Sequence, residues 1–208
     1  MKTSQRGFSI IEVAVVMVVI GMMLATAVPA MSAWFRNMKL RNQAETIQAG
    51  LQQARNEAVR RNQPVSFYLV STTTANKLDN NCSVAANGTS WVVSLRSPAG
   101  ACGATPTASS SDSTNPLIVT ARTGADGASG VAVNGYAGAV TDTSTAASSV
   151  TFDALGRRSG NLTHLVVNYA SGQSADRPMR VDISSAGMVR MCDTQVSDSS
   201  DPRRCPTS

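Results

Sequence analysis

Apolar residues fill the first part of the chain with a single interruption. From Phe8 to Ala33 the only charged residue is Glu12, and about 20 apolar residues in a helix suffice to cross the hydrocarbon core of a bilayer. We therefore predict a membrane-spanning helical segment over residues 8–33. A carboxylate within such a segment costs on the order of a few kcal/mol on insertion scales, so Glu12 is expected to have a cationic partner.

The pattern changes to an amphipathic one beyond Pro29, where we expect the helix to kink or open locally. Over residues 34–62, apolar residues recur every three or four positions, which predicts one buried stripe along a helix. Pro64 lacks an amide hydrogen and disfavours helical geometry at Gln63, so we expect the helix to end at Asn62-Gln63-Pro64. The stripe comprises Leu40, Ala44, Ile47, Leu51, Ala54 and Ala58.

Residues 63–208 alternate short β-branched runs with clusters of turn-forming residues. The polar stretches 98–116 and 141–149 are expected to be loops. The chain is thus predicted to be an α+β protein, with one long helix packed on a small antiparallel β domain. The expected strands are residues 65–70, 91–95, 117–120, 131–134, 150–153, 165–169, 179–183 and 188–191.

The positive charge of the chain lies mainly on the predicted helix. The formal net charge is +5, and residues 36–61 hold six Lys or Arg against two Glu. Residues 62–208 hold ten Lys or Arg against ten Asp, so this part is neutral overall. The basic composition therefore mostly reflects the helix, and residues 157–208, with seven Arg against five Asp, carry a mild basic bias.

The first residues suggest a targeting signal. Residues 1–7 form a short basic peptide that ends in Gly7, and the long apolar run begins at Phe8. A secretory signal peptide has a shorter apolar region of about 7 to 15 residues. A plain single-pass anchor, with Lys2 and Arg6 on the cytoplasmic side, accounts for the topology but leaves Glu12 unexplained.

Gly7, Phe8 and Glu12, at these offsets, resemble the class III leader of type IV pilins and type II secretion pseudopilins. The resemblance implies cleavage after Gly7 by a prepilin peptidase and N-methylation of Phe8. It also implies that Glu12 pairs with the Phe8 amine of a neighbouring pilin during assembly. The implied fold is the type IV pilin fold. Its parts would be a leader (1–7), a transmembrane half-helix (8–33), an amphipathic half-helix (34–62) and a periplasmic β domain (63–208).

Two later stretches narrow the resemblance to the GspH/FimT class of minor pilins, on the FimT side. They are Phe152 to Arg157, which reads Phe-x-x-x-Gly-Arg, and the cysteine-bounded C-terminus. The implied function is that of an inner-membrane precursor that joins other pilins and primes or modulates pilus assembly at the cell surface. The alternatives are a type II secretion pseudopilin of the GspH type and a DNA receptor at the pilus tip.

A DNA role is suggested by the end of the chain. Some FimT-like proteins carry a Gly-Arg-x-Arg motif implicated in DNA binding for natural transformation, but here Met188 replaces its first arginine. The candidate DNA-binding residues are Arg180, Arg190, Arg203 and Arg204. Such a patch would bind the phosphates of double-stranded DNA without sequence specificity. The alternative is that Arg203 and Arg204 pair with nearby aspartates and hold the loop together.

Four cysteines allow three disulfide pairings. We favour Cys82 with Cys102 and Cys192 with Cys205, because each pair closes a short local loop worth about 3 kcal/mol in the loop-entropy model. A zinc site is disfavoured by the lack of CxxC spacing and by His164 being the only histidine.

The chain also lacks HExxH, GxSxG and P-loop motifs, so we expect neither an enzyme nor a cofactor.

Overall fold

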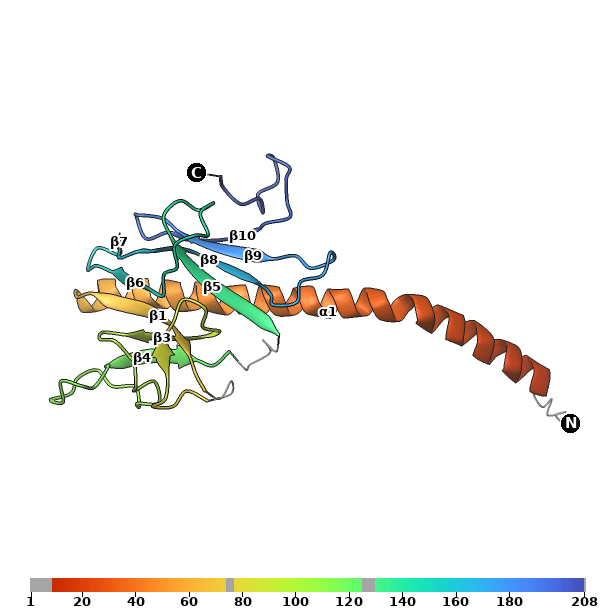
Figure 1. Cartoon of the computed structure of the whole chain (residues 1–208), viewed down its shortest axis with the longest axis horizontal. Helices are drawn as coiled ribbons and strands as arrows, with labels where there is room; N and C mark the ends of the chain where they lie inside the picture. Colours follow the sequence, from red (N-terminus) through yellow and green to blue (C-terminus); the bar gives the residue numbers. More distant parts are fainter. Residues whose placement is uncertain (1–8, 74–76, 125–129, 208) are drawn as a thin grey trace, which may run out of the picture. The chain divides into compact units, whose positions relative to one another are not determined.

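The computed structural model describes residues 9–73, 77–124 and 130–207, except for the side chains of residues 26–30 (Figure 1). The chain divides into two compact units, residues 1–36 and residues 37–208. Its elements are α1 (Ile10–Arg61), β1 (Val65–Ser71), β2 (Ser83–Val84), β3 (Ser90–Ser94), β4 (Ile118–Arg122), β5 (Val131–Ala137), β6 (Ser149–Phe152), β7 (Arg158–Ser159), β8 (Leu162–Tyr169), β9 (Met179–Ile183) and β10 (Val189–Asp193).

The described part of the first unit is helical from Ile10 onward. The helix starts at Ser9, whose carbonyl accepts hydrogen bonds from the backbone N–H groups of Glu12 and Val13. Helical structure continues across Pro29, so this proline does not end the helix. Among the described residues, no helix has a stretch that is both long and apolar enough to span a bilayer. The predicted span, 8–33, includes positions outside the described residues and remains a prediction.

The helix ends where the sequence predicts, and its end is capped. Asn62 adopts a left-handed backbone conformation, with φ of 52°. The Asn62 N–H donates to the carbonyl of Val59 and the Gln63 N–H donates to the carbonyl of Ala58. This pair of bonds is a Schellman motif, which supplies hydrogen-bond donors to carbonyls that have no partner within the last helical turn.

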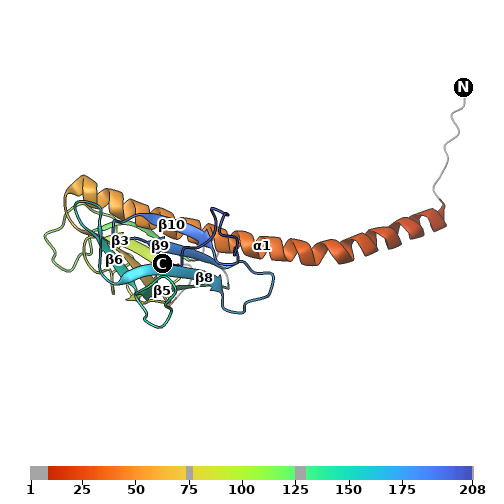
Figure 2. The same ribbon diagram turned by 90° about the horizontal axis from the view of Figure 1, so that it is seen from above.

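All eight predicted strands are present, and they form two antiparallel sheets. The first has the order β4-β3-β1-β6-β7, with β2 also paired to β1. The second has the order β10-β9-β8-β5. Figure 2 shows the strands gathered along one side of the C-terminal part of α1. The prediction of an α+β fold with antiparallel sheets is confirmed, and only the two-residue strands β2 and β7 were not predicted.

The main core lies between α1 and the two sheets. Every residue of the predicted stripe, from Leu40 to Ala58, is fully buried, so the helical periodicity is confirmed. Phe67 and Trp91 stack with their ring centroids 5.6 Å apart, and they belong to the same cluster as Leu165 and Val181 of the second sheet. Burial of large aliphatic and aromatic side chains at about 25 cal/mol per Å² is the main stabilising contribution here.

A second, smaller core explains why β1 and β3 are buried on both faces. Val70, Val92 and Ile118 pack with Cys82 and Cys102, which form a disulfide. The polar loop 98–116 runs over this cluster without forming a strand. Arg96 closes the neck of the loop, because its Nη1 donates to the carbonyls of Asp112, Ser113 and Asn115 at 3.2–3.3 Å.

Candidate functional site

The N-terminal part of α1 presents an exposed apolar surface with one acid. Ile10 is 90% exposed and Ile11 is 71% exposed, and every described side chain from Ser9 to Ala25 is exposed. Glu12 is the only charged residue in this stretch and lies in the first turn of α1. Gly7 and Phe8 lie outside the described residues, so leader cleavage, N-methylation and the Glu12 pairing remain predictions.

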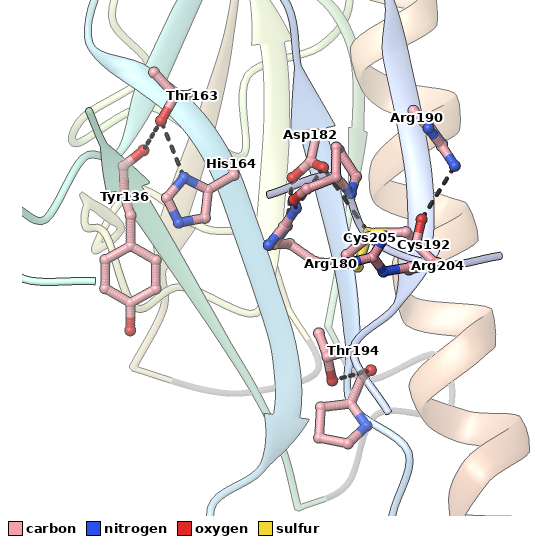
Figure 3. A network of polar contacts seen from close by, with 12 residues as sticks. Tyr136, Thr163, His164, Arg180, Asp182, Arg190, Cys192, Thr194, Arg204 and Cys205 are labelled. Carbon is pink, nitrogen blue, oxygen red and sulfur yellow. Dashed lines mark hydrogen bonds and ion pairs between the residues drawn. A yellow bond between two sulfur atoms is a disulfide. The ribbon is translucent and has the colours of Figure 1, made fainter. Parts of the chain in front are cut away.

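The outer face of the second sheet carries a polar row that crosses all four strands. The strand register places Tyr136 of β5 opposite His164 of β8, His164 opposite Asp182 of β9, and Asp182 opposite Arg190 of β10. Figure 3 shows Asp182 and Arg190 beside the tail residues Arg204 and Cys205, with Tyr136 and His164 further away. Strand alternation sends Val181 and Ile183 into the core and Asp182 to the opposite face. Residues far apart in sequence therefore meet at one surface.

Arg180 is buried rather than displayed, which the sequence did not indicate. Its Nε and Nη2 donate to the two carboxylate oxygens of Asp182 at 2.7 and 3.0 Å. The same Nη2 donates to the carbonyl of Pro206 at 2.6 Å. Both side chains are only 10% exposed. A bidentate, buried pair of this kind is costly to break, so the structure argues against Arg180 as a DNA ligand.

The other three candidate arginines are brought together by the disulfide between Cys192 and Cys205. Arg190 is exposed, and its Nη2 donates to the carbonyls of Pro202 and Arg204 at 2.9 and 3.1 Å. The tail also pairs with the end of β10 through a parallel bridge between Asp193 and Arg204. Arg180 and Arg190 thus fasten the tail at several backbone carbonyls.

Arg203 pairs with an aspartate, as the alternative to DNA binding expects. Its Nε and Nη2 donate to the carboxylate of Asp201 at 3.1 and 2.7 Å. The hydrogen bond from the Arg203 side chain, followed by that from its backbone N–H, lowers the pKa of Asp201 to about 2. The Arg203 side chain nevertheless remains 65% exposed, so solvent reaches its guanidinium. Asp193 pairs instead with Arg177, at 3.1 Å.

Both disulfides follow the pairing that loop length favours. Cys82 joins Cys102 across 20 residues, and Cys192 joins Cys205 across 13. The second bond lies against the polar row, since the Cys192 sulfur is 3.8 Å from a carboxylate oxygen of Asp182. The loop-entropy model gives each about 3 kcal/mol of stabilisation. The disulfide and the Arg180–Asp182 pair therefore form one contiguous structure under the tail.

His164 is fully buried in the polar row. Its Nδ1 lies 3.0 Å from Thr163 Oγ1, and that hydroxyl already donates to the Tyr136 carbonyl. The other ring nitrogen, Nε2, is buried and, among the described residues, has no hydrogen-bond partner. Burial lowers the pKa of His164, although the negative charge of Asp182 partly opposes this and Arg180 adds to it.

We predict that the domain loses stability as the pH falls below about 6.5, because the unfolded chain then binds a proton that the folded His164 resists. The slope has an upper limit of about 1.4 kcal/mol per pH unit for one proton. Urea unfolding at pH 7.5 and pH 5.5 measures this slope for the wild type and for His164→Phe, which keeps a ring against Tyr136. Equal slopes in the two proteins would show that His164 is not responsible.

The Phe152–Arg157 stretch that narrowed the sequence resemblance packs against the turn before β10. Gly156 and Gly187 have φ of 73° and 77°, and a Cβ placed on Gly187 would lie 1.9 Å from the Gly156 carbonyl oxygen. Arg55 of α1 donates from Nε to that same oxygen at 3.0 Å. Arg55 is not part of the buried stripe that the sequence predicts. Its role was not foreseen, because it depends on how two distant turns pack.

Comparison with known families decides the assignment. The sequence profile described as "Type II transport protein GspH" matches residues 43–187, more than half of the chain. The chain belongs to the GspH family. A second profile, the prokaryotic N-terminal methylation motif, matches residues 2–28 of this GspH-family protein. The resemblance to minor pilins and pseudopilins drawn from the sequence is therefore confirmed.

Solved structures similar to this GspH-family protein include two with related descriptions. One is the type IV minor pilin FimU of Pseudomonas aeruginosa (strain PAO1), 18% identical, with a TM-score of 0.45 over 75% of this chain and 92% of that one. The other is the minor pseudopilin EpsH from the Type 2 Secretion System of Vibrio cholerae, 12% identical, with a TM-score of 0.43 over 76% and 99%. A search of curated protein sequences gave no significant match.

Proposed function

We propose that this GspH-family protein is a minor type IV pilin that primes or modulates pilus assembly. The observation that carries the proposal is the exposed apolar surface of residues 10–25 with Glu12 as its only charge. Exposure of such an apolar surface to water is unfavourable. We therefore expect this surface to be covered by the bilayer before assembly and by the helices of other pilins afterwards. Glu12 then lies where a cation on a neighbouring subunit would neutralise it.

The same helix surface suits a type II secretion pseudopilin, which is the alternative assignment. Both are structural subunits, and both require a processed N-terminus. The precursor would sit in the bacterial inner membrane with residues 63–208 in the periplasm. The genes beside this one separate the two, since a run of minor-pilin genes accompanies pili and a run of secretion genes accompanies export.

The proposal predicts a shortened N-terminus. Protein extracted from the membranes of the native host should begin at Phe8, because a prepilin peptidase would remove residues 1–7. Intact-mass measurement and N-terminal sequencing check this. A matched Gly7→Leu variant should retain Met1, since the residue before the cleavage site is changed. A wild-type chain that keeps its first seven residues would overturn the proposal.

A second role in DNA capture is favoured by one observation, the gathering of Arg190, Arg203 and Arg204 in the disulfide-closed tail. Three aspartates lie in the same segment, residues 190–205, so its formal charge is balanced. We therefore expect DNA retention only at low salt, because few phosphate contacts give weak binding that falls as salt rises.

A gel-shift titration tests the DNA role. The protein is mixed with duplex DNA at about 20 mM and 150 mM salt, beside a variant with Arg190, Arg203 and Arg204 changed to alanine. Retention at the lower salt that disappears in the triple variant supports the role. The matched control is Arg41→Ala on the exposed side of α1, which should bind as the wild type does. Absence of retention at low salt excludes the DNA role and leaves assembly untouched.

A further inference from the structure

Three of the four exposed large apolar side chains described in the second unit lie around the Gly156–Gly187 junction. Among the described residues 37–208, the exposed large apolar side chains are Met38, Val59, Leu155 and Met188. Leu155 and Met188 are 71% and 63% exposed. They come from different elements: Val59 from α1, Leu155 from the turn after β6 and Met188 from the turn before β10. We call Val59, Leu155 and Met188 the apolar patch.

A pocket of about 290 Å³ opens beside the patch. Its lining comes from α1, from the turn before β10 and from the first residue of β10, and Arg55 is the only charged residue among the described lining residues. A Cβ placed on Gly156 would lie 3.0 Å from Arg55 Nε and 3.2 Å from Val59 Cγ2, which ties the patch to the pocket. The lining residues are Gln52, Arg55, Asn56, Gly187, Met188 and Val189.

The walls of the pocket are held in place before anything binds. The close approach of Gly156 and Gly187 fixes two turns against each other. The Arg158 N–H donates to the carbonyl of Ser185 at 3.1 Å, and the Met188 N–H donates to Ser184 Oγ at 3.0 Å. A pocket that is already formed loses less conformational entropy on binding.

We propose that the pocket and the apolar patch bind a segment of a partner protein that presents a carboxylate next to an apolar side chain. Charge complementarity favours this occupant, because Arg55 contributes a guanidinium and no acidic residue is among the described residues that line the pocket. Gln52 and Asn56 add side-chain amides that can donate to the same carboxylate. Met188 is suited to such a surface, since methionine adapts its shape and is enriched at interfaces.

The proposal goes beyond helix-mediated assembly, because every residue of this site lies in residues 37–208. It also gives Met188 a role that differs from the arginine it replaces in the DNA-associated motif. An arginine at this position would add positive charge, whereas methionine adds apolar contact area. The site therefore recognises a protein surface rather than a phosphate backbone.

Peptide binding to the full chain in detergent micelles tests the site. The probe is a fluorescein-labelled peptide, Gly-Thr-Leu-Asp-Leu-Thr-Gly, followed by fluorescence anisotropy, with Asn in place of Asp as the second probe. We expect saturable binding of the Asp peptide and binding of the Asn peptide that is weaker by about fivefold. Met188→Ser and Leu155→Ser should each weaken binding of the Asp peptide to a similar degree.

The matched control is Met38→Ser, which removes an exposed methionine of the same domain away from the pocket lining and should leave binding unchanged. All three substitutions are at exposed positions, so unchanged melting temperatures are expected. Absence of saturable binding to the wild type, equal affinity for the two peptides, or an equal loss in Met38→Ser would each overturn the proposal. Because the test does not involve filaments, its failure leaves the assembly function standing.

Discussion

Replacing Gly187 with alanine is expected to lower the free energy of unfolding of the domain by about 2 to 4 kcal/mol. The added Cβ would lie 1.9 Å from the carbonyl oxygen of Gly156, so at least one of the two turns must move. The backbone of Gly187 is also left-handed, with φ of 77°, which costs an L-residue roughly 1 kcal/mol even without a clash. Movement of the Gly156 turn would in addition weaken its hydrogen bond from Arg55.

Urea unfolding of the wild type and the variant measures this loss. Gly172→Ala is the matched control, since its Cβ would meet nothing closer than 3.9 Å and its stability should change by less than about 0.5 kcal/mol. If Gly187→Ala were as stable as Gly172→Ala, the close packing of the two turns would be refuted. Such a result would also remove the basis for a preformed pocket.

Changing Glu12 to glutamine is expected to abolish incorporation into filaments while leaving the folded domain intact. The substitution keeps the size of the side chain and removes its charge, so only pairing with a cation on a neighbouring subunit is lost. The cation on the neighbouring subunit would then have no partner. An unpaired charge in an apolar environment costs on the order of a few kcal/mol, which is enough to exclude a subunit from a helix bundle. Immunoblots of sheared filaments and of whole cells measure the incorporated fraction.

Glu45→Gln provides the control for the loss of one carboxylate from the same helix. Glu45 is exposed and pairs with Arg41 at 2.8 Å, an interaction worth about 0.3–0.5 kcal/mol at most. This variant should enter filaments as the wild type does. If Glu12→Gln also enters filaments normally, with its leader removed, the charge of Glu12 has no part in assembly.

Local signals in the sequence were enough to predict most of the fold. The stripe from Leu40 to Ala58 has a helical period, and Pro64 ends the helix for a local steric reason. Strands such as β1 and β8 are rich in β-branched and aromatic residues. The two-residue strands β2 and β7 have no such pattern, because they arise from pairing with strands that are already in place.

The candidate site was harder to predict, because burial depends on the tail. Arg180 alternates along β9 with the core residues Val181 and Ile183, so its position on the outer face follows from the strand pattern. That face would be exposed in an ordinary sheet. The tail covers it through the disulfide of Cys192 and through hydrogen bonds to backbone carbonyls, which side-chain patterns do not reveal. Arg55 was missed for a related reason, since its acceptor is also a backbone carbonyl.

The hydrogen bonds from Arg96 hold the base of loop 98–116 in place, so the tip of this loop is structurally independent of the sheet. Three carbonyls at the far end of the loop are tied to one guanidinium, while the near end is tied by the disulfide of Cys102. Residues 108–111, between these ties, are exposed or half-buried. We therefore expect changes in length or composition there to leave the small core beneath unaffected. The tip is therefore the natural place for an inserted epitope or dye, which would allow the subunit to be followed in living cells.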